Sequence, residues 1–457
     1  MMEVNLRWLA FSLIFVCLFL ALTLLFGARP LNPIPGSVNR PLGRVHQLSS
    51  RPSPRSSSFF SSQSSADSES VDGSSAELEL PRVAYLLTGS KGDGNRMKRL
   101  LLALYHPHNE YLLHIDRESP VSERLDLARF IAFHPLFLLV GNVRLIVKSN
   151  LVTYPGPTMI STTLHGMSIF LRKKSKWDWF INLSASDYPL ITQDDFLHVL
   201  SSVPRGLNFL DHTSEIPDYK MRQRVRSMVV DPAIYRSTKS DLFFVQETRA
   251  TPNAFRLFQG SAWVMLSYNF CEYLIYGWDN LPRLALMYFA NVLSSPESYF
   301  HTVVCNSKEH FNTTVNTDLH FIAWQNPPTQ HPLFLNSTFY AAMVNASVPF
   351  ARKFKEDEPL LDTIDAKLLR GRRKGRVVEG GWCAGSEMQA EEPVGKEERN
   401  SSSSSSGGRA VGEGDGPDPC GVVGDPVALQ PGGGAKRFEK LINRVLEPTY
   451  FRGRQCV

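Results

Sequence analysis

The pattern of apolar and polar positions divides the chain into four stretches, and the first is a long apolar run. Trp8–Phe26 carries no charged residue and matches the ~20 apolar residues that cross a bilayer as a helix. A cleaved signal peptide would have an apolar core of only about 7–15 residues. The pattern therefore predicts a transmembrane signal anchor at 8–26, with residues 1–7 as a cytoplasmic tail.

The second stretch, residues 27–80, is rich in Ser, Pro and Arg and has no periodic apolar face. Such a segment cannot bury enough apolar surface to offset the entropy lost on ordering. We expect a disordered stem.

The third stretch begins at Pro81 with an apolar strand pattern, a Gly/Asp-rich turn, an amphipathic helix pattern and a second strand in "YLLHID". Further apolar runs at 143–147, 179–191 and 260–267 alternate with helical patterns such as "TMISTTLHGMSIFLRKK". This alternation predicts an α/β fold with a mixed, mostly parallel sheet covered by helices. The predicted luminal domain spans residues 81–383.

The fourth stretch, residues 384–457, contains the low-complexity run "SSSSSSGGRAVGEGDGPD" and then a tail with an amphipathic helix pattern at Lys436–Leu446. The pattern predicts a disordered insertion followed by a short tail. The formal net charge of +5 is small, and basic residues form no stripe interleaved with aromatics, so we expect no nucleic-acid partner.

Sequons and cysteines bear on which side of the membrane the domain faces. Sequons at Asn312, Asn336 and Asn345 predict glycosylation sites if this part is luminal, as does one at Asn400. Asn182 also begins a sequon, but it lies within "WFINLSASDYPL" and is expected to be a buried strand residue. Five cysteines follow the apolar run, without a C-x-x-C element, so in an oxidising lumen some should pair and one should stay free or pair between chains.

Polar residues at the ends of predicted strands are candidate ligand contacts, because ligands of open α/β sheets bind beyond the carboxyl ends of the strands. Gly89, with Gly92 and Gly94, could let a nucleotide approach the backbone, or could serve only the turn. Asp116 could bind a uridine or ribose, or cap its loop. Asp187 needs partners if it is buried, and these could be a structural hydrogen-bond network or a bound polyol.

Two further segments carry charged residues that could bind an anion or act as a base. Many nucleotide-sugar transferases bind the donor diphosphate through a divalent metal held by an acidic D-x-D at the end of a strand. No such motif follows an apolar strand here. A diphosphate would therefore need basic side chains, which "PFARKFK" supplies as Arg352, Lys353 and Lys355. A solvated charge run is the alternative. In "SSPESYFHTVV", Glu297 follows a proline, as expected for an acid in a first helical turn.

Taken together, five segments in order resemble the core-2/I-branching β-1,6-N-acetylglucosaminyltransferase family, glycosyltransferase family 14. They are "YHPHNEYLLHIDRE", "FINLSASDYPL", "LFQGSAW", "SSPESYFHT" and "VPFARKF". "LVTYPGPTM", "GWDNLPR", "LSSPESYFHTVVCN" and "NTTVNTDLHFIAWQNPPTQHP" are similar to the plant branch, the β-glucuronosyltransferases that act on arabinogalactan proteins.

The resemblance implies a GT-A type fold, an inverting single displacement and no required metal or other cofactor. It implies that Glu297 is the general base and that Lys353 binds the donor diphosphate. The family's second basic diphosphate contact has no arginine counterpart around Gln330 and His331, and Arg352 is the expected substitute. Lys220, Arg222 and Arg224 in "YKMRQRVRS" could contact the acceptor or the carboxylate of a glucuronosyl donor.

The expected protein is thus a single-pass type II Golgi membrane enzyme with a luminal catalytic domain. It would transfer glucuronic acid from UDP-glucuronate to β-linked galactan chains of type II arabinogalactan. Two alternatives stay open: a transferase of the same fold that uses UDP-N-acetylglucosamine or UDP-xylose, and a catalytically inactive, membrane-tethered glycan-binding protein.

Overall fold

The structure is a computed structural model that describes residues 79–173, 176–327, 329–384 and 418–456. The predicted cytoplasmic tail, the anchor at 8–26, most of the stem and most of the low-complexity insertion lie outside the described residues. Among the helices that the structure describes, none has the length and apolar character needed to span a bilayer.

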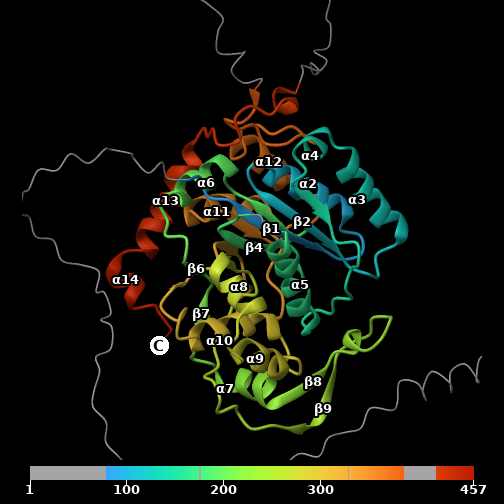
Figure 1. Cartoon of the computed structure of the whole chain (residues 1–457), viewed down its shortest axis with the longest axis vertical. Helices are drawn as coiled ribbons and strands as arrows, with labels where there is room; N and C mark the ends of the chain where they lie inside the picture. The colour runs from blue at the N-terminus through green and yellow to red at the C-terminus, as the bar shows by residue number, and fades with distance from the viewer. Residues whose placement is uncertain (1–78, 174–175, 328, 385–417, 457) are drawn as a thin grey trace, which may run out of the picture. The chain divides into compact units, whose positions relative to one another are not determined.

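A seven-stranded sheet organises the described chain (Figure 1). Its strand order is β12-β6-β11-β4-β1-β2-β3. β11 runs antiparallel to both of its neighbours, whereas the other neighbouring pairs run parallel. The prediction of a mixed, mostly parallel sheet is confirmed. The strands of this sheet are β1 (Val83–Gly89), β2 (Glu110–Ile115), β3 (Val143–Leu145), β4 (Trp179–Ser184), β6 (Asn208–Phe209), β11 (Met265–Ser267) and β12 (Thr314–Val315).

Helices cover both faces of the sheet because alternate side chains of its inner strands point to opposite sides. In β1, Val83, Tyr85 and Leu87 enter one apolar core, whereas Ala84 and Leu86 enter the other. The second core is closed by α5 (Thr158–Arg172), α8 (Tyr268–Tyr276), α9 (Leu281–Phe289) and α10 (Tyr299–Asn306). The first is closed by α2 (Gly94–Leu104), α3 (Val121–Phe133), α4 (Pro135–Val140), α6 (Gln193–Leu200), α11 (Tyr340–Ala346), α12 (Pro359–Lys367) and α13 (Gly433–Val445).

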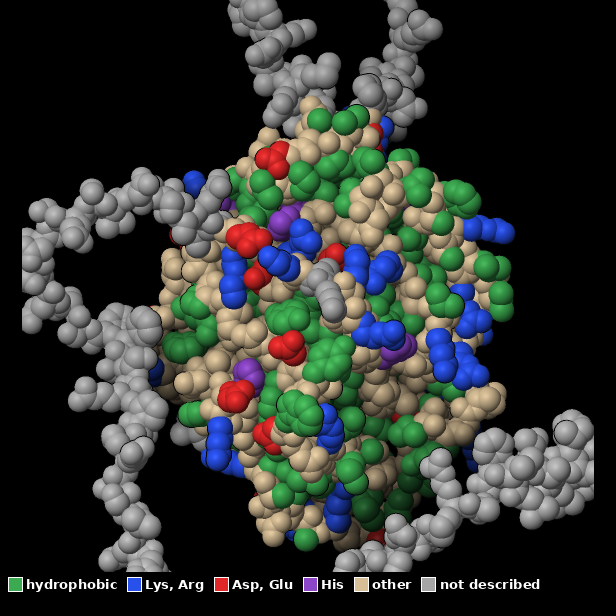
Figure 2. All heavy atoms as spheres, viewed as in Figure 1, with side chains coloured by type: hydrophobic (Ala, Val, Ile, Leu, Met, Phe, Trp, Pro, Cys, Tyr) green, Lys and Arg blue, Asp and Glu red, His purple; other side chains and the backbone are tan. Residues whose placement is uncertain are grey.

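Smaller sheets and short helices carry the loops around the main sheet. β13 (His320–Ile322), β14 (Phe350–Arg352) and β5 (Asp187–Pro189) form one sheet, β8 (Ser227–Val230) pairs with β9 (Phe243–Thr248), and β7 (His212–Thr213) pairs with β10 (Gln259–Gly260). The short helices are α7 (Asp218–Lys220), the π-helix η1 (Met221–Arg226), α14 (Pro448–Arg452), and the 3-10 helices η2 (Pro232–Ile234), η3 (Ser295–Glu297), η4 (Ser337–Phe339) and η6 (Pro419–Gly421). The apolar run 179–191 therefore holds two strands that belong to different sheets. On the face that Figure 2 shows, basic and acidic side chains are interspersed.

The folded part of the chain continues past Cys383, where the sequence placed its end. Helix α13 packs against α6, with the ring of Phe438 stacked 5.3 Å from that of Phe196. The N–H groups of Gly432 and Gln430 donate to the carboxylates of Asp195 and Asp194. The predicted amphipathic helix is present, and its apolar face is part of the main core rather than of a separate tail.

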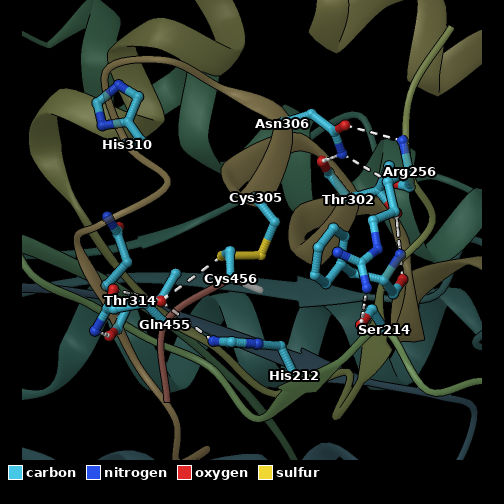
Figure 3. The surroundings of a disulfide bond; sticks show 12 residues. His212, Ser214, Arg256, Thr302, Cys305, Asn306, His310, Thr314, Gln455 and Cys456 are labelled. Atoms are coloured by element: carbon cyan, nitrogen blue, oxygen red, sulfur yellow. Dashed lines mark hydrogen bonds between the residues drawn. A yellow bond between two sulfur atoms is a disulfide. The ribbon is translucent and has the colours of Figure 1, made fainter. Parts of the chain in front are cut away.

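Two disulfides join the C-terminal segment to the domain, Cys383–Cys420 and Cys305–Cys456. The second links the end of α10 to the end of the chain (Figure 3). There the side chain of Gln455 donates to the carbonyl of Thr314 in β12 at 2.9 Å. Cys271 is free and buried, which confirms the expectation of pairing with one cysteine left over.

Replacing both Cys305 and Cys456 by Ser should lower the free energy of unfolding by about 3 kcal/mol, because the unfolded chain regains the freedom that the cross-link removes. Urea unfolding of the purified protein, followed by tryptophan fluorescence, measures this change. Cys271→Ser is the matched control for the loss of a thiol without the loss of a cross-link. An unfolding midpoint equal to that of the unchanged protein would contradict the expectation.

Candidate active site

Glu297 lies at the end of the 3-10 turn η3, directly before Ser298 and the first residue of α10. Ser294, with φ of +57°, turns the chain into η3, and its N–H donates to the carbonyl of Pro155 at 2.9 Å. The sequence predicted Glu297 in the first turn of the helix itself. The structure instead closes a separate short turn there, because the backbone of Ser298 leaves the helical region before α10 begins.

Arg224 is the direct partner of Glu297. Its guanidinium donates to a carboxylate oxygen of Glu297 at 2.5 Å, and the two side chains are 21% and 28% exposed. The π-helix η1 carries Arg224 to this position, with Val225 buried beside it. A charge-assisted hydrogen bond of this kind fixes the direction of the carboxylate. Arg224, predicted as a substrate contact, therefore supports the candidate base.

The hydroxyl of Tyr154 is influenced by several charged residues of the site. Burial raises the pKa of its hydroxyl, the nearby Glu297 raises it further, and the cations of Arg352 and Arg224 lower it. Three charged groups that were singled out from separate segments thus act electrostatically on one phenol. Tyr154 itself is half exposed. It was missed in the sequence, although "LVTYPGPTM" was noted as a segment, because nothing in the pattern shows that this loop folds against η3.

Arg352 and Asp187 pair across neighbouring strands. They are opposite one another in the register of β14 and β5, and Arg352 Nε lies 3.1 Å from a carboxylate oxygen of Asp187. The other oxygen of Asp187 accepts from the N–H of Ser184 at 2.6 Å, and the guanidinium lies over the ring of Trp263 at 4.0 Å. Asp187 is fully buried, and its carboxylate is the counter-charge of Arg352.

Lys353 extends the positive region. Desolvation lowers the pKa of its ammonium, and the nearby cations of Arg352 and Arg96 lower it further. Its Nζ lies 4.4 Å from the ring centroid of Phe334. Like charges held together disfavour each other, so a bound anion would relieve this repulsion. Lys353, Arg352 and Arg96 thus make this part of the described surface a candidate anion site.

Replacing Asp187 by Asn should lower the free energy of unfolding by about 3 kcal/mol, because it leaves the Arg352 cation without its buried counter-charge. Chemical denaturation measures this loss. Asp362→Asn is the matched control, since Asp362 pairs with Arg99 at 2.7 Å but its side chain is 72% exposed, and exposed pairs contribute at most about 1 kcal/mol. Equal losses in the two variants would contradict the structural role of Asp187.

Gly89 and Asp116 lie side by side at the carboxyl ends of β1 and β2, where the N–H of Asp116 donates to the carbonyl of Gly89 at 2.9 Å. The Asp116 carboxylate accepts from the N–H groups of Glu118 and Val152 and lies 3.4 Å from Lys239 Nζ. Asp116 thus caps its loop, and the segment it holds leads two residues on to Tyr154. A Cβ on Gly89 would lie 2.3 Å from the sulfur of Met97, so this glycine allows α2 to pack closely.

The remaining predicted residues lie at or near the surface, except Asn182. Lys220 is half-buried at the end of α7 and Arg222 is exposed on η1, two residues from Arg224. Asn312, Asn336 and Asn345 are exposed. Asn182 is buried in β4, where its side chain bonds to the backbone of Ala262 and Val264, as predicted.

One group of His, Cys, Asp and Glu side chains in the described ranges is close enough to share a metal ion: His212, Cys305 and Cys456. Its two cysteines are joined in a disulfide and are not free to act as thiolate ligands. Cys305 lies in the last turn of α10, next to Cys456 and His212 (Figure 3), whereas Glu297 precedes the first turn.

Comparison with known proteins identifies the class of this α/β protein. The family model for the Core-2/I-Branching enzyme matches residues 83–344. The chain therefore belongs to this family, and it is a glycosyltransferase.

Three similar proteins of this family are β-glucuronosyltransferases of a plant. The chain is 52% identical over 402 residues to Beta-glucuronosyltransferase GlcAT14B of Arabidopsis thaliana, covering 88% of this chain and 86% of that protein. It is 51% identical over 376 residues to Beta-glucuronosyltransferase GlcAT14A of the same plant, covering 82% and 78%. It is 43% identical over 377 residues to Beta-glucuronosyltransferase GlcAT14C, covering 82% and 85%.

Proposed function

We propose that this glycosyltransferase transfers glucuronic acid from UDP-glucuronate to β-linked galactan chains of type II arabinogalactan. The observation that carries the proposal is the ion pair between Glu297 and Arg224, whose charges, together with that of Arg352, act on the pKa of Tyr154. Lys353 follows Arg352 directly in the chain. A base and a set of fixed cations in one site are what a single displacement at an anomeric carbon requires. The β-glucuronosyltransferase names of the three relatives support the choice of sugar.

The reaction follows from these groups. An acceptor hydroxyl gives its proton to the Glu297 carboxylate as its oxygen forms a bond to C1 of the glucuronosyl group. The bond from C1 to the diphosphate oxygen breaks on the opposite side, and its electron pair leaves with UDP. Lys353 and Arg352 stabilise the charge that develops on this leaving group. The anomeric configuration inverts, as in a GT-A type transferase of this family.

The proposal includes two further features of the donor site. The cations of Arg352 and Lys353, supported by Asp187, take the place that a divalent metal would have beside the diphosphate. Asp116 and Gly89 border the nucleoside end of the site. Arg222, exposed close to Arg224 on η1, and Lys220 are available to the glucuronate carboxylate or to the acceptor.

We also propose a location in the Golgi membrane, with a single type II anchor at 8–26, a luminal catalytic domain and glycans on Asn312, Asn336 and Asn345. The two disulfides of the described chain support an oxidising compartment. The exposure of the three asparagines supports modification in the lumen.

A donor panel tests the proposed function. The purified full-length protein is incubated with β-galactan oligosaccharides and with UDP-glucuronate, UDP-N-acetylglucosamine or UDP-xylose in separate reactions that contain EDTA. We expect transfer from UDP-glucuronate. Transfer from another donor alone would overturn the sugar assignment, and UDP binding without transfer from any donor would favour a glycan-binding protein.

A further inference from the structure

A second hollow lies away from the site described above. It has a volume of about 1130 Å³ and is lined by the end of α8, the turn that follows it, the start of α9 and the residues after α10. Asn306, the last residue of α10, and His310, which follows the helix, both line it (Figure 3). Glu297 lies at the other end of this helix, which at 1.5 Å per residue is about 12 Å long. None of the residues assigned above to the base or the diphosphate lines this hollow.

Aromatic side chains border the hollow and are open to water. Trp278 is 101% exposed and Tyr276 is 51% exposed, and Tyr273 lines the wall. An indole left wholly in water keeps a large apolar surface available to a ligand. Its segment, "GWDNLPR", was noted in the sequence, and the base and the cations of the active site make no use of it.

The turn that carries Trp278 is fixed by its neighbours. The carboxylate of Asp279 accepts from the N–H of Leu281 at 3.0 Å and from the hydroxyl of Tyr273 at 2.7 Å. The guanidinium of Arg283 donates to the carbonyls of Gly277 and Asp279. Trp278 is therefore presented from a turn that is already ordered, and a ligand would bind it without the entropic cost of ordering a loop.

The charge around the hollow is negative. Glu272, Asp279 and Glu309 line it against one lysine, Lys308, and the Arg283 guanidinium lies at the carbonyls of the turn. The backbone N–H of Leu281 and the hydroxyl of Tyr273 hold the pKa of Asp279 below its usual range, while burial lowers the pKa of His310 and so favours its neutral form. Such a surface repels nucleotides, anionic lipids and acidic sugars. It suits a neutral ligand that has apolar faces and hydroxyl donors.

We propose that this hollow, the Trp278 groove, binds an unsubstituted stretch of the galactan acceptor, at a distance from the residue that receives glucuronate. This inference rests on the proposed function for the identity of the glycan. The C–H face of a galactose ring packs on the indole of Trp278, and its hydroxyls donate to the carboxylates of Glu272 and Glu309. Acceptors long enough to reach the groove are held at two points, which raises their effective concentration at the active site.

The charge of the Trp278 groove also gives it a preference among acceptors. A galactan stretch that already carries glucuronate brings carboxylates next to Glu272, Asp279 and Glu309, and its binding is weakened. The groove therefore directs the enzyme to chains with unmodified galactose.

Trp278→Ala tests the groove in the purified full-length protein. The side chain is wholly exposed, so folding should be unaffected. With long β-galactan as acceptor we expect KM to rise about tenfold, equivalent to about 1.4 kcal/mol of binding, while kcat and the KM for a galactan too short to span both sites stay unchanged. Phe133→Ala is the matched control, since Phe133 is 78% exposed at the end of α3.

Direct titration separates this inference from the proposed function. Calorimetry with unsubstituted β-galactan, in the absence of any UDP-sugar, should show binding that Trp278→Ala weakens, even if the donor is not UDP-glucuronate. Equal galactan affinity in the unchanged protein and in Trp278→Ala would overturn the inference. So would equal affinity for unsubstituted and glucuronate-bearing galactan, because the acidic rim would then play no part.

Discussion

Replacing Glu297 by Gln should lower the rate of transfer to galactan by about 10²–10⁴-fold, the usual contribution of a general base. The amide keeps the size of the side chain but cannot take the proton of the acceptor hydroxyl. Its oxygen can still accept from Arg224, so the local geometry is retained. Initial rates with saturating UDP-glucuronate and galactan measure the effect.

The Glu297→Gln protein should otherwise be little changed. Its affinity for UDP should match that of the original protein, and its melting temperature should fall only slightly, since the Glu297–Arg224 pair that loses its charge is partly exposed to water. Retention of most of the activity would contradict the assignment of Glu297 as the base. Loss of activity together with loss of folding would leave Glu297→Asp, which keeps the carboxylate, as the deciding variant: partial rescue is expected from it.

Replacing Lys353 by Ala should lower kcat by about 10²–10³-fold, as expected when one fixed charge is removed from a developing negative charge. The leaving diphosphate would then rely on Arg352 alone. The affinity for UDP should fall as well, because in the proposed mechanism the same ammonium would bind the product diphosphate. Steady-state kinetics and UDP titration measure the two effects separately.

Lys355→Ala is the matched control for Lys353. Lys355 follows two residues later, is exposed, and its ammonium lies 5.5 Å from the same Phe334 ring. Equal losses of rate in the two variants would show that the segment acts as a general basic patch, which was the alternative weighed for this sequence.

The spacing of apolar and polar residues within single segments was enough to predict several parts of the fold. The alternation of strand and helix patterns after Pro81 correctly predicted a mostly parallel sheet with helices on both faces. In the structure, the side chains of β1 accordingly alternate between two apolar cores. Asn182 was correctly placed in a buried strand because apolar residues surround it. Glu297 was found through its proline and through the family resemblance.

Contacts between distant segments were not predictable in the same way. Arg224 and Glu297 meet across 73 residues, and nothing in "YKMRQRVRS" shows which of its cations turns inward. The position of Tyr154 near these charges depends on the contact between its loop and η3, where the N–H of Ser294 donates to the carbonyl of Pro155. Helix α13 was separated from the domain by a low-complexity run, so its apolar face was recognised but its partner on α6 was not.

The configuration of the product tests the central claim most directly. UDP-glucuronate carries its sugar in the α configuration, and a single displacement with Glu297 as base inverts it. The proton NMR spectrum of the product formed from UDP-glucuronate and a β-galactan oligosaccharide should therefore show a β-linked glucuronosyl group on galactose. An α-linked product would contradict the mechanism, and an unmodified oligosaccharide would contradict the proposed transfer itself.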